Sequence, residues 1–335
     1  MSAVARQRAV RDGRVSLTSL SLGGAPIGNL SRATSDEDAR GAVDAAWDAG
    51  VRYFDTAPHY GLGLSERRMG AALRDRPRDE FVVSTKVGRL LEPNPGATGE
   101  DDEGFAVPAT LRRRRDYSRD GVLRSLEASV ERLGLDRVDV LFVHDPDEHY
   151  REVLDGAYPA LHELRDQGVV RAIGAGMNQA EMLADFARNT DMDLLMLAGR
   201  YTLLEQDALD DLLPTCERRN VSIVAAGVFN SGLLARDRPP DDAKYNYDEA
   251  PRELVERARR MADVCERHGV RLPAAALAFP LGHPVVASVC IGARSGAQIA
   301  RNAELFEAPV PDDLWAELRA EGLLREDAPT PGASS

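Results

Sequence analysis

The chain has 335 residues, of which 43% are hydrophobic, and a formal net charge of −13. This length allows one large domain or two ordinary ones, and the negative charge argues against an extended nucleic-acid footprint. No apolar run is long enough to span a bilayer, and three scattered cysteines do not indicate a disulfide framework. Without a secretory signal pattern at the N-terminus, we expect a cytoplasmic protein.

Eight short runs rich in aliphatic and β-branched residues alternate with helical patterns along the chain. Strands that alternate with helices form a parallel sheet, and eight such units close naturally into a barrel. We therefore predict an α/β fold, a (β/α)8 TIM barrel that forms a single domain over residues 1–335. The predicted strands cover residues 19–23, 52–55, 81–86, 138–143, 169–173, 194–197, 222–225 and 285–291.

Helix boundaries are marked by capping residues: serine or threonine before the first turn, and glycine after the last. Each of the first four predicted strands is followed by such a helix, as the barrel requires. These helices are predicted over 36–49 with Thr34 or Ser35 as the cap, 65–73 with Ser65 as the cap, 120–133 between Ser118 and Gly134, and 150–167 stopped by Gly168.

Three further segments do not fit the strand–helix repeat. Residues 7–10 and 14–17 flank an Asp-Gly turn and are predicted to pair as an N-terminal β-hairpin before the first barrel strand. Residues 89–117 and 229–250 are long and polar, and they follow the third and seventh strands. Both long loops are therefore expected at the C-terminal face of the barrel, where such barrels keep their active sites.

Two other segments are expected to be solvent-exposed. Arg112 to Arg115 form a run of four arginines, and such runs are usually solvated rather than a partner site. Residues 328–335 have the composition of a flexible tail.

A doubly wound dinucleotide-binding domain is the alternative fold. Its phosphate-binding turn has the spacing Gly-x-Gly-x-x-Gly directly after a first strand. The two glycine-rich segments of this chain, Gly23-Gly24-Ala-Pro-Ile-Gly28 and Gly174-Ala-Gly176, both miss that spacing. The barrel is therefore the favoured fold.

Three consecutive predicted strands end on residues that can take part in proton transfer. Asp55, Lys86 and His144 close these runs, and Tyr60 follows Asp55 by five residues in a turn. Because the carboxyl ends of parallel strands meet at one edge, we expect the four side chains to gather there. Each residue alone is more often structural, but the combination is specific.

The combination suits hydride transfer at a carbonyl carbon, which needs a proton at the carbonyl oxygen. A tyrosine phenol has a pKa of about 10 and is a poor base at neutral pH. The Lys86 ammonium would favour the Tyr60 phenolate, and Asp55 would keep Lys86 charged and oriented. His144 would hydrogen-bond the substrate oxygen and share the proton transfer.

The sequence resembles the aldo-keto reductase superfamily over about residues 15–310. The resemblance implies a (β/α)8 barrel that binds NAD or NADP in an extended form, with Tyr60 as general acid/base, Lys86 and Asp55 supporting it, and His144 orienting the carbonyl. The motifs that carry it are Asp55-Thr-Ala-Pro-His-Tyr60-Gly61 with Glu66, Ser84-Thr-Lys86, and Asp139-Val-Leu-Phe-Val-His144.

The resemblance also implies cofactor contacts at four places in the chain. Asn178 would bind the carboxamide, and Asp55 would lie beside the cofactor. At the end of the first strand, the pyrophosphate or nicotinamide would be bordered by Gly23, Gly24 and Ala25. Near the C-terminus, a segment similar to the family's adenosine-phosphate segment offers Gly292, Arg294, Gln298 and Asn302.

Some positions depart from the family pattern. Ala198 stands where a glutamine often contacts the carboxamide, residues 225–227 lack an aromatic that often stacks on nicotinamide, and Arg301 replaces a common acidic residue. Gly292 stands where strongly NADP-selective relatives often carry a lysine. We therefore expect use of both NAD and NADP, with Arg294 as the first candidate for a 2′-phosphate contact.

A narrower resemblance concerns one branch of the family. Three segments, 144–149, 176–179 and 197–204, are similar to the L-fucose dehydrogenase or D-threo-aldose 1-dehydrogenase branch. This resemblance implies oxidation of an aldose such as L-fucose, L-galactose or D-arabinose at C1 to the lactone. Pyridoxal oxidation and general aldehyde or ketone reduction are the alternatives within the superfamily.

Two alternatives lie outside this activity. A metal-dependent hydrolase could use the same barrel, but no His-x-His occurs near the first strand, and no metal site is expected. A non-enzymatic nucleotide-binding regulatory subunit could keep the barrel, although the four catalytic-type residues argue against it. We expect a small-molecule substrate and no nucleic-acid or membrane partner, while the oligomeric state does not follow from the sequence.

Overall fold

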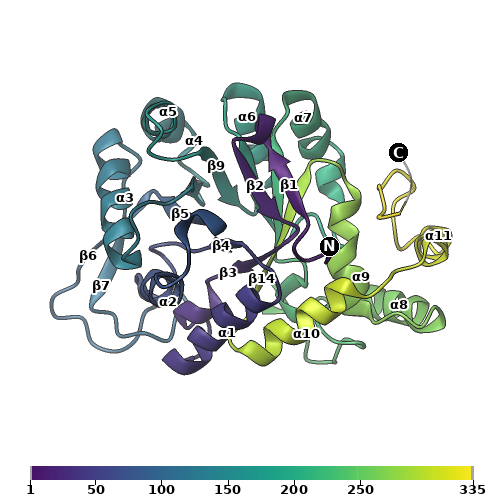
Figure 1. Cartoon of the computed structure of the whole chain (residues 1–335). Helices are drawn as coiled ribbons and strands as arrows, with labels where there is room; N and C mark the ends of the chain where they lie inside the picture. Colours follow the sequence, from purple (N-terminus) through teal and green to yellow (C-terminus); the bar gives the residue numbers. More distant parts are fainter. Residues whose placement is uncertain (1, 247, 333–335) are drawn as a thin grey trace.

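In the computed structural model, which describes residues 2–246 and 248–332, eight parallel strands close into a barrel (Figure 1). This arrangement confirms the predicted fold class. In order around the barrel, the strands are β3 (Leu20–Gly23), β4 (Tyr53–Asp55), β5 (Val82–Val87), β8 (Val140–His144), β9 (Ala172–Met177), β10 (Leu194–Ala198), β11 (Ser222–Ala226) and β14 (Val286–Gly292).

Helices surround the barrel, and the antiparallel hairpin of β1 (Gln7–Val10) and β2 (Val15–Thr18) lies across one end of it, as predicted (Figure 1). The main helices are α1 (Asp36–Asp48), α2 (Leu64–Leu73), α3 (Arg119–Leu133), α5 (Tyr158–Asp166), α6 (Ala180–Asn189), α7 (Leu212–Arg219), α8 (Arg252–Arg267), α9 (Leu272–Ala278), α10 (Gly296–Glu307) and α11 (Asp312–Ala320).

Side chains alternate across each barrel strand, so every second one points into the barrel. Phe54, Val83 and Leu141 point outward and join the core between strands and helices. The hairpin contributes to the inner cluster and so closes that end of the barrel. The inner cluster includes Val10, Val15, Leu17, Tyr53, Val82, Val140 and Phe142.

The fifth barrel strand, β9, lies further along the chain than the predicted 169–173. The strand continues through Gly174 and Gly176, although glycine normally weakens a strand. Here glycine is required: a Cβ built on Gly174 would lie 1.9 Å from the carbonyl oxygen of Leu194 on the neighbouring strand. The glycine-rich segment is therefore barrel strand rather than loop.

Helix ends follow the predicted caps in two of three cases. The hydroxyls of Ser35 and Ser118 accept hydrogen bonds from backbone N–H groups in the first turns of α1 and α3. Ser65 is instead the second residue of α2, which follows Gly63, and its hydroxyl donates to the carbonyl oxygen of Gly24 at 2.8 Å. Ser65 thus ties α2 to the loop after β3.

The predicted single helix over 150–167 is interrupted. It consists of a short turn, α4 (Tyr150–Glu152), a π-helical turn over Val153–Ala157, and α5. Gly156 lies within this turn against the chain before α3, and a Cβ there would be 2.5 Å from the carbonyl oxygen of Tyr117. The π-helical turn therefore lies where the backbone of Gly156 packs closely against that of Tyr117.

The two long loops contain small hairpins, which the sequence did not reveal. β6 (Arg89–Pro93) pairs with β7 (Leu111–Arg115), and β12 (Lys244–Tyr245) pairs with β13 (Asp248–Glu249). Strand alternation buries Arg113, whose side chain is 4% exposed in an ion pair with Asp101, whereas that of Arg112 is 63% exposed. The expectation that the whole arginine run is solvated was therefore wrong for Arg113.

Residues 328–332, which were expected to form part of a flexible tail, are packed against the rest of the protein. Ala328 and Thr330 are buried, and Arg319 of α11 donates to the carbonyl oxygen of Ala328 at 2.8 Å. Residues 333–335 lie outside the described residues. In the described part of the chain, no helix is both long and apolar enough to cross a membrane.

Two helical glycines should respond in opposite ways to alanine. A Cβ on Gly70 of α2 would lie 1.8 Å from the carbonyl oxygen of Leu133, whereas one on Gly41 of α1 meets nothing closer than 3.9 Å. We predict that Gly41→Ala stabilises the protein by about 0.5–1 kcal/mol. Gly70→Ala should destabilise it by about 1–3 kcal/mol, because α2 must move away from α3. Urea unfolding measures the free energy of unfolding of both variants. A change in the same direction in both would contradict the packing described.

Candidate active site

Strand alternation brings three of the predicted residues together at the C-terminal end of the barrel. Tyr53 points into the barrel from β4, so Asp55, two residues later, does too. The same alternation turns Lys86 of β5 and His144 of β8 inward, and these three strands are neighbours. All three side chains are buried.

Lys86 and Asp55 form a buried ion pair in which each side chain is 2% exposed. Lys86 Nζ donates to Asp55 Oδ2 at 2.6 Å and to the carbonyl oxygen of Thr56 at 3.0 Å, while Ser84 Oγ donates to Asp55 Oδ1 at 2.7 Å. Burial alone would lower the pKa of Lys86, but Asp55 and Tyr60 outweigh it and raise that pKa above its usual value. The ammonium therefore stays charged.

Tyr60 lies in the loop between β4 and α2, where two backbones touch. A Cβ on Gly61, which has φ 63°, would lie 2.1 Å from the carbonyl oxygen of Gly28, so the close approach requires glycine. Lys86 Nζ lies 4.7 Å from the Tyr60 ring centroid, and the His144 and Tyr60 ring centroids are 5.5 Å apart. The structure thus brings all four predicted side chains together.

The surroundings set the protonation of Tyr60 and His144. Burial raises the pKa of Tyr60, and the Lys86 ammonium acts in the opposite direction. Lys86 therefore favours the phenolate as expected, but burial outweighs it in the free protein. Burial, together with the Lys86 and Arg89 cations, lowers the pKa of His144 well below its usual value. His144 is thus neutral at physiological pH and can donate one hydrogen bond.

Tyr60, Lys86 and His144 line a pocket of about 670 Å³, referred to below as the substrate pocket. Phe105, from the 89–117 loop, forms part of the wall, and its ring centroid lies 6.1 Å from that of Tyr60. Lys86 is the only lysine or arginine among the described residues that line the pocket. The carboxylates that line it belong to Glu100, Asp101, Glu103 and Asp145.

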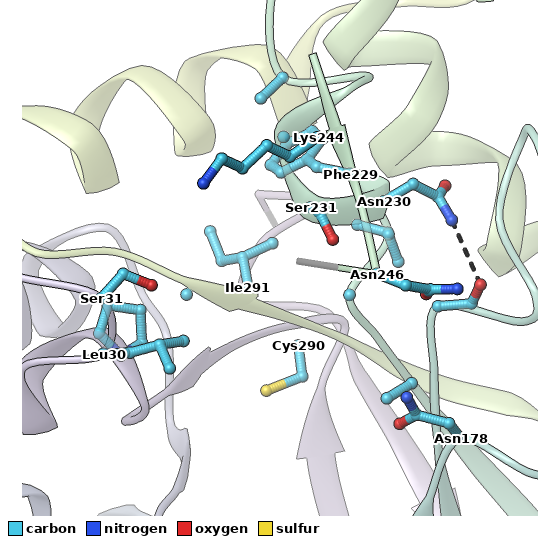
Figure 2. Close-up of a pocket in the computed structure, with 18 of the residues that line it drawn as sticks. Leu30, Ser31, Asn178, Phe229, Asn230, Ser231, Lys244, Asn246, Cys290 and Ile291 are labelled. Carbon is cyan, nitrogen blue, oxygen red and sulfur yellow. Dashed lines mark hydrogen bonds between the residues drawn. The ribbon is translucent and has the colours of Figure 1, made fainter. Parts of the chain in front are cut away.

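A second pocket, of about 530 Å³, adjoins the first and is referred to below as the cofactor pocket. The two share Leu30, Ser31, Asn178 and Ala198. Figure 2 shows Asn178 and Cys290 on the barrel side of this pocket and Lys244 on the opposite side. An elongated ligand could therefore reach from the barrel centre to the protein edge.

The structure divides the predicted cofactor residues into two groups. Asn178, Gly292 and Arg294 line the cofactor pocket, and Ala25 lines the substrate pocket. The others are not among the lining residues of either pocket. Gly23 and Gly24 are needed for close packing, since a Cβ on Gly24 would lie 2.4 Å from Ser65 Oγ. Gln298 accepts a hydrogen bond from the Arg294 backbone N–H, and Asn302 is buried in α10.

Arg294 is occupied by the loop after β3. Its Nη1 donates to the carbonyl oxygens of Pro26 and Arg32 and to Thr34 Oγ1, each at 3.2 Å, and its Nη2 donates to the carbonyl oxygen of Leu30. To contact a 2′-phosphate with these groups, Arg294 would have to give up bonds to the loop. The geometry instead favours a bracing role for Arg294.

The long loops supply residues that the sequence did not single out. Phe229 lines the cofactor pocket two residues beyond 225–227, where the family pattern places an aromatic. Asn230 Nδ2 donates to the carbonyl oxygen of Gly199 at 3.2 Å, which joins this loop to the end of β10 (Figure 2). Loop length and polarity indicated function, but not which side chains face inward.

No cluster of three or more His, Cys, Asp or Glu residues suited to a metal occurs within residues 2–246 and 248–332.

Comparison with known proteins agrees with this geometry. The model of the aldo/keto reductase family matches residues 19–321. D-threo-aldose 1-dehydrogenase from a Pseudomonas species is 50% identical over 95% of this chain and 96% of its own length. Pyridoxal 4-dehydrogenase from Microbacterium luteolum is 40% identical, over 95% and 98% of the two chains. The chain therefore belongs to the aldo/keto reductase family and is an oxidoreductase.

Solved structures share the barrel. A glycerol dehydrogenase from Gluconobacter oxydans superposes with a TM-score of 0.76 at 23% identity, over 100% of this chain and 99% of that one. The holo form of an aldo-keto reductase from Bacillus halodurans gives a TM-score of 0.73 at 23% identity, over 94% and 96%. At such identities the likeness supports the fold alone.

Proposed function

We propose that the chain oxidises an aldose at C1 to the lactone, with NAD or NADP as the oxidant and Tyr60 as the general base. One observation carries the proposal: the buried Lys86–Asp55 ion pair places its ammonium 4.7 Å from the Tyr60 ring centroid, and Tyr60, Lys86 and a neutral His144 all line the substrate pocket. Besides the hydride acceptor, the reaction needs no separate nucleophile or metal, because the hydroxyl of a cyclic hemiacetal is an alcohol that the base can deprotonate directly.

The residues fit an extended dinucleotide. Asn178 offers an amide where the two pockets join, Phe229 offers a ring, and the pocket continues outward to Gly292. When bound, an oxidised nicotinamide supplies the hydride acceptor. As the C1–H bond breaks, the hydroxyl proton passes to the Tyr60 phenolate and the C1–O double bond of the lactone forms. Lys86 stabilises the phenolate, and His144 holds the reacting oxygen.

The substrate pocket suits a neutral polyhydroxy compound. Carboxylate oxygens accept hydrogen bonds from sugar hydroxyls, and four carboxylates line the pocket. Asp101, Glu103 and Asp145 are held in place by ion pairs with Arg89 or Arg113. The 50% identical relative is named as a D-threo-aldose 1-dehydrogenase, which supports the same class. Pyridoxal is the second candidate because the 40% identical relative is named as a pyridoxal 4-dehydrogenase.

The experiment that tests the proposal is initial-rate oxidation of L-fucose, L-galactose, D-arabinose and pyridoxal, each with NAD and with NADP. We expect the highest kcat/KM for an aldose and a lactone as the first product. Faster oxidation of pyridoxal than of every aldose would favour the second candidate. Tight cofactor binding without turnover on a broad aldose and aldehyde panel would favour a regulatory role.

Tyr60→Phe removes only the hydroxyl that exchanges the proton. We predict that kcat for aldose oxidation falls by about 10²–10⁴-fold, the usual value of general acid–base catalysis, while the Kd of the cofactor is unchanged. Steady-state rates and fluorescence titration measure the two effects. Tyr150→Phe, which alters a phenol bonded to Asn189 on the outer surface, is the matched control. Near-wild-type turnover in Tyr60→Phe would exclude Tyr60 as the base.

The single-turnover oxidation rate should rise from neutral to alkaline pH. Oxidation needs the phenolate, and the pKa of Tyr60 is raised by burial with Lys86 opposing the rise. Removing the cation in Lys86→Met should therefore move the rate increase to higher pH by about 1–3 units. The Lys86→Met/Asp55→Asn double variant avoids an unpaired buried carboxylate and should shift in the same direction. A shift to lower pH would contradict the role of Lys86.

Cofactor choice should not depend on Arg294. Because its guanidinium braces the loop after β3, Arg294→Ala should weaken NAD and NADP binding alike, by about 2- to 10-fold. We expect NAD to be at least competitive with NADP in the wild-type protein. Fluorescence titration of the wild-type protein and of Arg294→Ala with each cofactor gives the ratio of the Kd for NADP to the Kd for NAD. Selective loss of NADP binding would instead restore Arg294 as the 2′-phosphate contact.

A further inference from the structure

Asp145 directly follows His144 and has a backbone conformation that few non-glycine residues adopt. Its φ is 37°, in the left-handed region, and its N–H donates to the carbonyl oxygen of Gly176 at 3.0 Å. This turn brings Asp145 Oδ2 to within 3.5 Å of His144 Nε2. Such conformational outliers concentrate at functional sites, so the carboxylate calls for an explanation.

Arg89 holds this carboxylate in place. Arg89 Nη2 donates to Asp145 Oδ2 at 2.8 Å, and Arg89 Nη1 lies 3.2 Å from His59 Nδ1 and 3.5 Å from Glu103 Oε2. The Arg89 side chain is only 9% exposed. A guanidinium only donates hydrogen bonds, so His59 Nδ1 must be the acceptor. Burial and the neighbouring Arg89 lower the pKa of His59 to about 2, which keeps the ring neutral and this arrangement fixed.

The neutral ring of His144 carries one proton, which can sit on either nitrogen. Nδ1 is buried and has no hydrogen-bond partner among the described residues. Nε2 lies beside the Asp145 carboxylate. An N–H group is attracted to an anion, whereas a nitrogen lone pair is repelled by it. The carboxylate therefore favours the form with the proton on Nε2.

We propose that Asp145, anchored by Arg89, is a positioning residue that keeps the His144 proton on Nε2, the nitrogen next to the Asp145 carboxylate that lines the substrate pocket. Its effect on catalysis rests on the proposed function. At 3.5 Å the carboxylate favours the Nε2–H tautomer without holding the N–H in a hydrogen bond, so this group would remain free to donate to the reacting sugar oxygen. The tautomer itself can be observed without any substrate.

Nitrogen NMR of the histidine rings tests the tautomer directly. Protein labelled with ¹⁵N-histidine is compared as wild type, as Asp145→Asn, and as the control Glu148→Gln, which neutralises an exposed carboxylate three residues further on. The variant His144→Gln assigns the His144 signals. We expect Nε2–H in the wild type and the control. In Asp145→Asn a neutral amide oxygen replaces the anion beside Nε2, because Arg89 still needs an acceptor at that position. The preference for Nε2–H is then weaker, so the Nδ1–H form should appear.

Kinetics of the same variants test the consequence. Asp145→Asn should lower kcat for aldose oxidation by roughly 10- to 100-fold, the range seen when the partner that orients a metal-ligating histidine is lost, without changing the Kd of the cofactor. Arg89→Met should lower kcat as well. That variant leaves Asp145 without its cation, so Asp145→Asn, which adds no unpaired charge, is the deciding variant.

Two results would overturn the proposal: wild-type kcat in Asp145→Asn, or a fall in kcat while His144 keeps its proton on Nε2. If the wild-type protein oxidised no aldose, the proposed function would fail, but the NMR comparison would still decide the tautomer. An unchanged tautomer in Asp145→Asn would reject the role of Asp145 whatever the activity.

Discussion

The buried ion pair between Lys86 and Asp55 is the interaction on which the rest of the site depends. Two opposite charges that are each 2% exposed must be close and hydrogen-bonded, because an unpaired charge at that depth is strongly destabilising. The pair joins neighbouring strands β4 and β5, and Ser84 and the carbonyl oxygen of Thr56 complete its hydrogen bonds. Barrel closure supplies this geometry, and the pair in turn gives Tyr60 a fixed positive charge.

Burial has opposite consequences for the groups around this pair. It raises the pKa of Tyr60 and lowers that of His144, so both are neutral in the free protein, while Lys86 stays charged because Asp55 outweighs burial. The site thus holds the Lys86 cation beside two neutral proton-carrying groups. The two long loops complete the two pockets. The 89–117 loop forms the carboxylate-lined wall of the substrate pocket, and the 229–250 loop borders the cofactor pocket.

The sequence predicted what depends on strand ends and missed what depends on contacts between distant segments. Asp55, Lys86 and His144 could be placed because alternation along adjacent parallel strands has only one outcome at the barrel rim. The predicted fifth strand stopped at residue 173, because the need for glycine at Gly174, beside the Leu194 carbonyl of the next strand, is a tertiary contact that no local pattern shows. The bonds of Arg294 to the 26–34 loop could not be predicted either, because they arise only in the folded chain.

In the proposed reaction, a hydride leaves C1 of an aldose while Tyr60 takes the hydroxyl proton. The most direct measurement uses L-fucose carrying deuterium at C1, incubated with NAD⁺ and the wild-type protein, followed by mass spectrometry of both products. We predict a lactone without the label, NADH carrying one deuterium, and a slower single-turnover rate than with unlabelled sugar. Reduced cofactor without deuterium, or a label retained in the sugar product, would contradict it.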